Sequence, residues 1–486
     1  MADSSEVVGE GTYGCVHKPS LNCEKENRPP PNKITKLMKD SEAEKEYAEY
    51  DIMEQVDPKH DYYLGAPKKC KVDVNIYNQK SAAKCSRLKK EDSNLTRNLA
   101  KYMLLVMENG GDNLEDFADN AKKWPKNAEN IQRIEHFWLE AHRVLGGVKA
   151  FLDHGYIHHD LKPQNIVYNV ENGRINLIDF GMMQKKSNVI KEAARSKYGF
   201  SIYHWSFPLD TKYLNRSNYD KFAKRSDKFK TDYVGSVIGS LKTDNNTEGS
   251  NAIRSFLLYS ANKKGKLLNI ERVTEGIVKH FTETMLYQIV PGEDNYNKAV
   301  NKCLDTIDLY GVGLGLIYVL KTLNAHMDKK LAGELEQLFL DMVSANLMDR
   351  IDIETAMNRY EEILNKCGIL EKFNKHFENH ILVDGPVIPV NLEKTIDSIK
   401  TKSVSISPKE MSSMLEKDPD MLEPKSTSAI VKKQGKPRLV IRTGECPEGK
   451  ELHPKTRRCV KKCKENEVRN ERFECRKTQR KWKNRK

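Results

Sequence analysis

The 486-residue chain has few of the features that mark membrane or secreted proteins. We find no run of the roughly 18–20 apolar residues that a membrane helix needs. The segment from Met1 to Glu10 lacks the basic stretch and apolar run of a secretory signal, and no internal repeat is visible. Hydrophobic residues make up 38% and charged residues 31% of the chain, as in a globular protein with polar additions. These absences predict an intracellular protein without a membrane span.

The net charge of +13 is unevenly distributed along the chain. Residues 441–486 hold 17 Lys and Arg against 7 Glu, an excess of +10. Such a tail can attract nucleic acid, an acidic protein or an anionic membrane surface. A solvated terminal segment without a partner is the alternative interpretation. The composition of 401–436, rich in Ser, Lys and Pro, predicts a flexible linker before the tail.

The ten cysteines lack the paired C-x-x-C spacing of a zinc ribbon and fall into two groups. Six are scattered and are expected to be reduced, as in an ordinary intracellular enzyme: Cys15, Cys23, Cys70, Cys85, Cys303 and Cys367. Four lie in the basic tail, with intervals of 12, 3 and 11 residues between them: Cys446, Cys459, Cys463 and Cys475. Zinc binding with His453 as a further ligand, a disulfide, and free thiols are three alternatives for this second group.

A glycine-rich segment near the start fits the pattern G-x-G-x-x-G-x-V. Glycine allows the backbone to close over phosphates. The predicted nucleotide-binding residues of this segment are Val8, Gly9, Glu10, Gly11, Thr12, Tyr13, Gly14, Cys15 and Val16. Lys36, on a predicted strand over 33–37, is placed to contact the α- and β-phosphates, with Lys33 as the competing candidate. Helices are predicted over 41–56 and 128–154, and the polar stretch 65–98 is expected to be an insertion or long loop.

The segment His-His-Asp-Leu-Lys-Pro-Gln-Asn at 158–165 carries the strongest chemical signal. Asp160 can accept the proton of a substrate hydroxyl, Lys162 can offset charge on a transferring phosphate, and Asn165 offers an oxygen ligand to Mg²⁺. Nineteen residues after Asp160, Asp179 opens an Asp-Phe-Gly turn directly after a predicted strand. Its carboxylate can hold the other side of a Mg²⁺–phosphate assembly.

With these motifs, residues 8 to about 367 resemble the eukaryotic-type protein kinase superfamily. The resemblance implies an α+β, bilobal protein kinase fold that binds ATP with Mg²⁺ (or Mn²⁺) between a small β-rich lobe and a large helical lobe. It implies that proteins are the substrates, and Lys162 favours Ser/Thr over Tyr acceptors. The predicted divisions are a kinase domain over 1–375 (lobes about 1–110 and 111–375, insertion about 211–300), a flexible linker over 376–440 and a basic cysteine-containing module over 441–486.

The resemblance also implies roles for residues outside these motifs. Met107 would gate the back of the ATP pocket, and the hinge would be Glu108, Asn109 and Gly110. Pro208-Leu-Asp210 resembles the A-P-E segment of the family, with Asp in place of Glu. Arg350 is the expected partner of Asp210, and the stretch 308–313 is the helix expected to anchor the catalytic loop from below.

Three departures from the family pattern stand out. The glutamate that should pair with Lys36 is ambiguous among Glu42, Glu46 and Glu49, and we favour Glu49 because apolar residues then fall on its packing side. His159 replaces the arginine whose usual partner is a phosphorylated residue of the activation loop. We therefore hypothesise that activity does not need phosphorylation there. The stretch 210–308 is also much longer than the family norm.

The tail pattern C-P-x-G-K…P-K-T-x-R-C-V-K-K resembles short cysteine-containing modules on proteins of large nucleocytoplasmic DNA viruses (iridovirus- or mimivirus-like). Such viruses also encode divergent kinases with long insertions. The resemblance implies a viral kinase in the host cytoplasm or a viral factory, with packaging in the virion as a further option. A pseudokinase or scaffold recruited through its tail is the main alternative, and a nucleic-acid-binding tail is another.

Overall fold

The computed structural model describes residues 4–11, 13–26, 32–197, 206–243 and 270–385, together with four short strands between 450 and 477. The chain divides into two compact units, Met1–Val390 and Asn391–Lys486. The first contains every predicted catalytic residue, although Thr12 of the glycine-rich segment lies outside the described residues.

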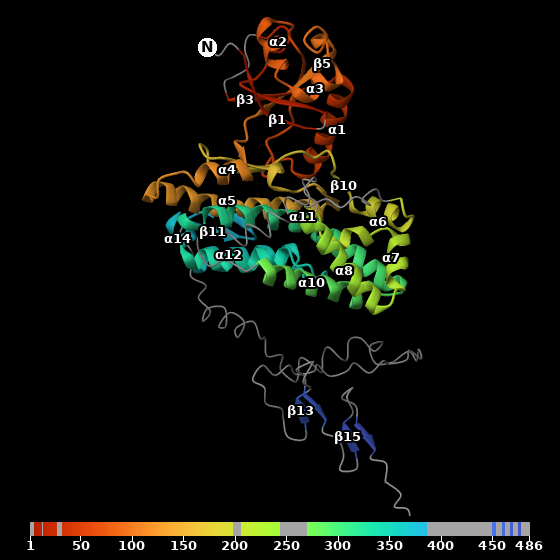
Figure 1. Cartoon of the computed structure of the whole chain (residues 1–486). Helices are drawn as coiled ribbons and strands as arrows, with labels where there is room; N and C mark the ends of the chain where they lie inside the picture. Colours follow the sequence, from red (N-terminus) through yellow and green to blue (C-terminus); the bar gives the residue numbers. More distant parts are fainter. Residues whose placement is uncertain are drawn as a thin grey trace, which may run out of the picture. The chain divides into compact units, whose positions relative to one another are not determined.

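A five-stranded antiparallel sheet forms the small lobe of the first unit, in the order β1-β2-β3-β5-β4 (Figure 1). The strands are β1 (Glu6–Glu10), β2 (Gly14–Lys18), β3 (Lys33–Lys39), β4 (Lys68–Lys71) and β5 (Tyr102–Glu108). In the register of the three central strands, Lys36 lies between Val16 and Leu105, so these side chains share one face of the sheet. Helix α1 (Asp40–Val56) follows β3 directly and contacts β3 and β5.

The predicted insertion over 65–98 is a folded element rather than a loop. It contains β4, α2 (Ile76–Ala82) and α3 (Ser86–Glu91), and the 3₁₀ turn η1 (Leu99–Lys101) leads from it into β5. Side chains at both helix starts accept hydrogen bonds from backbone amides, Asn75 from Asn78 and Cys85 from Leu88. These two helices were not predicted, because they are short, rich in lysine and bury few apolar residues.

The large lobe is mainly helical and lies beneath the small lobe in Figure 1. Its helices are α4 (Leu114–Ala121), α5 (Ala128–Asp153), α6 (Lys186–Ala194), α11 (Glu293–Leu323), α12 (Lys329–Met342), α13 (Ile353–Lys366) and α14 (Ile369–Lys372). Short strands β6 (Asp112–Asn113), β8 (Ile166–Asn169) and β9 (Arg174–Leu177) form one sheet, and β7 (Tyr156–Ile157) pairs with β10 (Gln184–Lys185). The prediction of a β-rich small lobe and a helical large lobe is confirmed.

Helix α11 and the following turn η4 (Asn324–His326) are long and apolar enough to cross a membrane by length and composition alone. No stretch of this kind was expected from the sequence. Of its apolar window, 89% is buried inside the lobe, where it packs against α4, α5 and α12. The apolar character of α11 is therefore explained by its place at the centre of the lobe.

The described parts of the predicted insertion over 211–300 belong to the large lobe. They form η3 (Leu209–Tyr213), α7 (Arg216–Ala223), α8 (Asp227–Thr243), α10 (Ile270–Tyr287) and the start of α11. Residues from these elements share a second core cluster, in which Tyr219, Phe281 and Tyr296 are almost fully buried. Tyr296 donates a hydrogen bond to the Leu214 carbonyl (2.8 Å). The described part of this stretch therefore contributes buried side chains to the core of the large lobe.

The predicted linker over 376–440 begins too early. Strands β11 (Lys375–Glu378) and β12 (Ile381–Asp384) form a hairpin, and Phe377 and Leu382 pack against the main core. In the second unit the described strands form two hairpins: β13 (Lys450–Leu452) with β14 (Cys459–Lys461), and β15 (Glu467–Arg469) with β16 (Cys475–Lys477). The side chains of the tail cysteines, and the remaining linker, lie outside the described residues.

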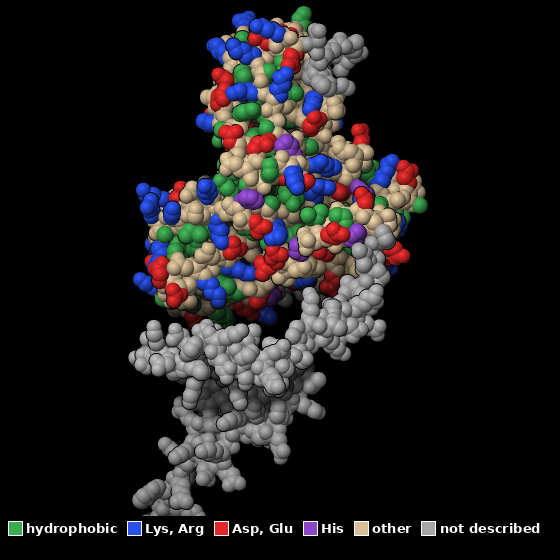
Figure 2. Space-filling model, turned by 180° about the vertical axis from the view of Figure 1, so that it is seen from behind, with side chains coloured by type: hydrophobic (Ala, Val, Ile, Leu, Met, Phe, Trp, Pro, Cys, Tyr) green, Lys and Arg blue, Asp and Glu red, His purple; other side chains and the backbone are tan. Residues whose placement is uncertain are grey.

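Basic and acidic side chains are interspersed over both lobes on the face shown in Figure 2. This mixed surface agrees with the near-neutral composition of the chain before residue 441.

Candidate functional site

The catalytic loop is held from below by one buried carboxylate. Asp308 on α11 accepts hydrogen bonds from the backbone amides of His158 (2.7 Å) and His159 (2.8 Å). Gly311, one turn further along α11, allows close approach, because a Cβ there would lie 1.9 Å from the Leu161 carbonyl oxygen. The helix predicted to anchor the loop therefore does so through a carboxylate and a glycine.

Asp160, Lys162 and Asn165 form a compact polar cluster at the loop. The Lys162 ammonium lies 2.8 Å from Asp160 Oδ2, and the Asn165 side-chain amide donates to Asp160 Oδ2 (3.0 Å) and to its carbonyl oxygen (2.8 Å). Asp160 is 8% exposed. Both of these Asn165 bonds use Nδ2, so the amide oxygen is the atom available to a cation. The structure thus brings together three residues that the sequence singled out.

The turn that begins at Asp179 presents an exposed carboxylate next to a buried ring. Asp179 has a left-handed backbone conformation (φ 64°), which is uncommon outside glycine and concentrates at functional sites. The next residue, Phe180, is 2% exposed. Its ring lies 5.3 Å from that of His158 and 5.8 Å from that of Tyr50. These contacts connect the catalytic loop, the Asp179 turn and helix α1.

His158 is fixed in one orientation by backbone groups. The Asp160 amide donates to its Nδ1 (3.4 Å), and its Nε2 lies 3.2 Å from the Ile178 carbonyl oxygen. This pattern requires a proton on Nε2 and none on Nδ1. His158 therefore holds the catalytic loop against the strand that leads to Asp179.

In the small lobe, Lys36 pairs with Glu46 of α1, with 2.5 Å between Nζ and Oε2. The preference for Glu49 is wrong in this structure. Ala43, three residues before Glu46, packs with Met38 of β3 and Leu105 of β5, so the helix face that carries Glu46 turns toward the sheet. The competing Lys33 instead forms an ion pair with Glu108 at the end of β5.

Glu49 lies beside the Asp179 turn instead. A Cβ at Gly181 would lie 3.4 Å from Glu49 Oε1 and 3.5 Å from Asp179 Oδ1. Burial, with the neighbouring carboxylates of Glu46 and Asp179, raises the pKa of Glu49 to about 7. Glu49 is therefore protonated over part of the physiological pH range.

Exchanging Glu46 and Glu49 separately for glutamine tests this assignment. We expect Glu46→Gln to lower kcat/KM for phosphoryl transfer about 10- to 100-fold, because a hydrogen bond to a charged group contributes about 1.5–3 kcal/mol. Glu49→Gln should change it less than about 3-fold. Steady-state kinetics at pH 7.5 measure both variants. A larger loss of kcat/KM in Glu49→Gln than in Glu46→Gln would show that Glu49 is the partner of Lys36.

Glu49→Gln should also stabilise the nucleotide-free, metal-free protein at alkaline pH. A carboxyl whose pKa is raised by folding costs no stability below its unfolded pKa of about 4.5, and the cost grows until pH passes about 7. The gain in melting temperature should therefore be largest at pH 8 and shrink toward pH 5. A gain that is equal at both pH values would contradict the shift.

Both the glycine-rich turn and the chain next to the hinge contain positions where only glycine avoids a steric clash. Gly11 donates its amide proton to the Gly14 carbonyl (2.9 Å), and a Cβ at Gly14 would lie 2.3 Å from the Leu37 carbonyl oxygen. Directly after the hinge, a Cβ at Gly111 (φ 88°) would lie 2.1 Å from the Tyr168 carbonyl oxygen. Met107 pairs with Ile34 of β3.

His159 occupies a buried polar position next to the activation segment. Its Nδ1 lies 2.9 Å from Gln184 Nε2, and its ring stacks 5.5 Å from that of Phe207. Burial, together with His158, lowers the pKa of His159 to about 3, so the ring is neutral near pH 7. The contact of Gln184 with His159 was not predicted, because nothing in the local sequence marks a pair 25 residues apart.

The expected partnership of Asp210 and Arg350 is present and fully buried. Arg350 Nη2 lies 2.6 Å from Asp210 Oδ1, and both side chains are at most 1% exposed. Arg350 also donates to the Ser344 carbonyl (3.0 Å) and to Thr306 Oγ1 (3.2 Å). Aspartate in place of the family's glutamate therefore still reaches the arginine.

Four cysteines expected to be reduced form two disulfides in the small lobe, which corrects that expectation. Cys15 is bonded to Cys85 and Cys23 to Cys70, with Cα–Cα distances of 5.9 and 5.8 Å. The sequence gave no sign of these pairings, because the bonded cysteines are 70 and 47 residues apart along the chain. Of the cysteines in the described part of the chain, Cys303 and Cys367 are free.

Comparison with known proteins agrees with this geometry. Residues 3–203 match the family described as "Protein kinase domain". A 54-residue stretch is 55% identical to the proteins named "Serine/threonine-protein kinase Kist" of Mus musculus, Rattus norvegicus and Homo sapiens. It covers 10% of this chain and 13% of each relative, so only a small part of their length is matched. Both findings support a protein kinase of the eukaryotic type.

Proposed function

Since residues 3–203 match the protein kinase domain, we propose that this chain transfers the γ-phosphoryl group of ATP to serine and threonine hydroxyls of proteins. The cluster of Asp160, Lys162 and Asn165 carries the proposal, because it places a cation and an amide within hydrogen-bonding distance of one carboxylate. Lys162 supports Ser/Thr over Tyr acceptors by its resemblance to that branch of the superfamily.

The donor set fits ATP with a divalent cation. The amide oxygen of Asn165 and the exposed carboxylate of Asp179 are the hard oxygen ligands that Mg²⁺ or Mn²⁺ prefers, and Lys36, held by Glu46, supplies positive charge for phosphate. When bound, the nucleotide supplies the phosphoryl group and the metal ion offsets its charge.

Asp160 would orient the acceptor hydroxyl and take up its proton, because its carboxylate is buried at the loop and already accepts two donors. Lys162, which contacts that carboxylate, would offset the negative charge of the transferring group. The chain's own contribution is therefore positioning and electrostatics, as in other phosphoryl transfer enzymes.

Phosphoamino-acid analysis tests the proposed acceptors. The purified chain, with labelled ATP and Mg²⁺, is given a mixed panel of basic, acidic and neutral protein substrates. Label on serine or threonine supports the proposal, and label on tyrosine alone would contradict the Ser/Thr assignment. ATP binding without labelling of any substrate would favour the alternative of a pseudokinase or scaffold.

Activity should not require phosphorylation of the activation segment. A neutral His159, bonded to Gln184 and stacked on Phe207, offers no charge to a phosphate. Phosphatase-treated enzyme, verified by mass spectrometry, is expected to keep its kcat within about 3-fold, a margin well below the effect of a lost charged hydrogen bond. An enzyme active only after phosphorylation between Met182 and Ser206 would contradict this.

For the basic tail we propose a localising role toward an acidic protein or nucleic acid. Its excess of +10 over residues 441–486 supports this. The viral origin, and a location in host cytoplasm, viral factory or virion, are proposals supported by the resemblance of the tail. DNA binding that weakens with salt and disappears on truncation at about Gly444 would favour the nucleic-acid alternative.

A further inference from the structure

We propose that the Cys15–Cys85 disulfide is a redox latch, through which a dithiol reductant loosens the glycine-rich turn and weakens nucleotide binding. The inference rests on the proposed function, since it concerns the ATP site. Cys15 directly follows Gly14, the last glycine of the turn, and Cys85 caps the start of α3. The bond therefore joins the nucleotide-binding segment to the folded insertion.

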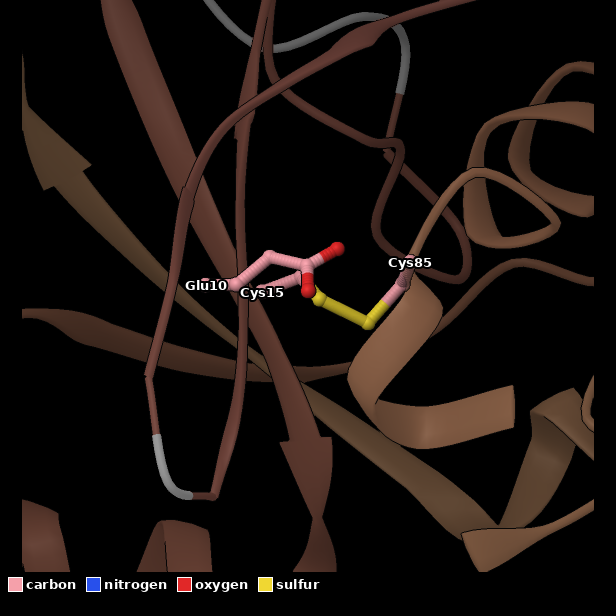
Figure 3. Close-up of side chains that lie close together, drawn as sticks. All are labelled: Glu10, Cys15 and Cys85. Carbon is pink, nitrogen blue, oxygen red and sulfur yellow. A yellow bond between two sulfur atoms is a disulfide. The ribbon is translucent and has the colours of Figure 1, made fainter. Parts of the chain in front are cut away.

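The insertion holds both strands that flank the turn. On the β1 side, Glu10 Oε1 accepts a hydrogen bond from the Ser86 amide of α3 (2.9 Å), and Lys84 pairs with Glu6 (2.6 Å). On the β2 side, the contact is the covalent bond from Cys15. Figure 3 shows Glu10 directly beside the two sulfur atoms. Residues 84–86 thus reach both ends of the turn.

The polar contacts alone would hold the turn weakly. Glu6 and Glu10 are exposed, and exposed ion pairs are screened and contribute little. The disulfide is covalent, so it restricts the position of Cys15 relative to α3 without being weakened by solvent screening. Because a preordered binding loop loses less conformational freedom when its ligand arrives, the oxidised form should bind nucleotide more tightly.

Reduction follows ordinary thiol–disulfide exchange. One thiolate of the dithiol attacks a sulfur of the bond and forms a mixed disulfide. Its second thiol then displaces the cysteine and closes the reductant's own disulfide. Two electrons and two protons end on Cys15 and Cys85 as thiols. Both cysteines are buried, so α3 must lift for attack, and this six-residue helix is short enough to open locally.

The second disulfide provides a matched control. Cys23–Cys70 also joins the start of the small lobe to the insertion, but neither cysteine adjoins the glycine-rich segment. Cys85→Ser breaks the first bond without altering that segment, whereas Cys70→Ser breaks the second. The two variants lose one cross-link each and should lose comparable thermal stability.

Two readouts test the latch on the full chain: the Kd of Mg²⁺·ADP by calorimetry, and amide hydrogen exchange over residues 6–18. We expect Cys85→Ser, and the parent reduced with dithiothreitol, to bind Mg²⁺·ADP roughly 3- to 10-fold more weakly and to exchange faster over 6–18. Cys70→Ser should match the oxidised parent in both. Thiol counts by alkylation and mass spectrometry establish the redox state of each sample.

An unchanged Kd and unchanged exchange in Cys85→Ser would overturn the latch. If the parent binds no nucleotide, the proposed function fails, while the exchange data still decide the latch. Glu10, Cys15 and Cys85 also bring three possible metal ligands together. Stoichiometric zinc uptake by the reduced parent that Cys85→Ser abolishes would overturn the latch in favour of a metal site.

Discussion

The Asp160→Asn variant is expected to transfer phosphate about 10²- to 10⁴-fold more slowly than the parent, the range in which a positioned general base contributes. Asparagine keeps the size of the side chain but cannot take up the hydroxyl proton. It also removes the negative charge that faces Lys162. The change should appear in kcat, because the acceptor is activated in the transition state, and the Kd for nucleotide should stay nearly the same.

Asp153→Asn is the matched control for this variant. Asp153 ends α5, seven residues before Asp160, and its side chain is 56% exposed and paired with Lys149 (3.0 Å). Its removal should leave kcat unchanged. Phosphoryl transfer by Asp160→Asn within 3-fold of the parent would show that Asp160 is not the catalytic base.

The second large effect concerns stability. Replacing Arg350 by methionine should lower the free energy of unfolding by about 3–5 kcal/mol, because it leaves the Asp210 carboxylate buried without its counter-charge. The side chains of Asp210 and Arg350 are both buried, so water cannot replace the lost partner. Chemical denaturation of the full chain, followed by tryptophan fluorescence, measures the change.

Two further variants identify the cause. Arg359→Met removes an arginine from a pair with Asp341 in which both side chains are 34% exposed, and it should cost no more than about 1 kcal/mol. Replacing Asp210 and Arg350 together by leucine and methionine should recover part of the loss, since no buried charge then remains. An Arg350→Met cost equal to that of Arg359→Met would contradict the account.

The parts of the site that lie close together in sequence could be predicted. Asp160, Lys162 and Asn165 fall within six residues, and their spacing alone brings them onto one loop. Helix α5 was predicted over 128–154 and ends at Asp153, because its apolar periodicity is sustained over many turns. Even the distant pair of Asp210 and Arg350 was expected, but only through resemblance to a family.

Contacts between distant segments could not be predicted from pattern alone. The choice between Glu46 and Glu49 depends on how α1 is rotated about its axis against β3. The apolar residues Ile52, Met53 and Val56 do not define which of the two glutamates faces β3. The two disulfides connect cysteines that are 70 and 47 residues apart. Cysteine spacing alone does not predict which cysteines pair. The hairpin over 375–384 is polar in composition, and the apolar residues that fix it to the core are few.

Transfer of labelled γ-phosphate and binding of Mg²⁺·ATP, measured on one preparation of the full chain, test the central claim most directly. The account predicts that the parent binds nucleotide and phosphorylates serine or threonine well above the Asp160→Asn baseline. Nucleotide binding with transfer equal to that baseline on every substrate of the panel would contradict it, and the chain would then be a nucleotide-binding scaffold.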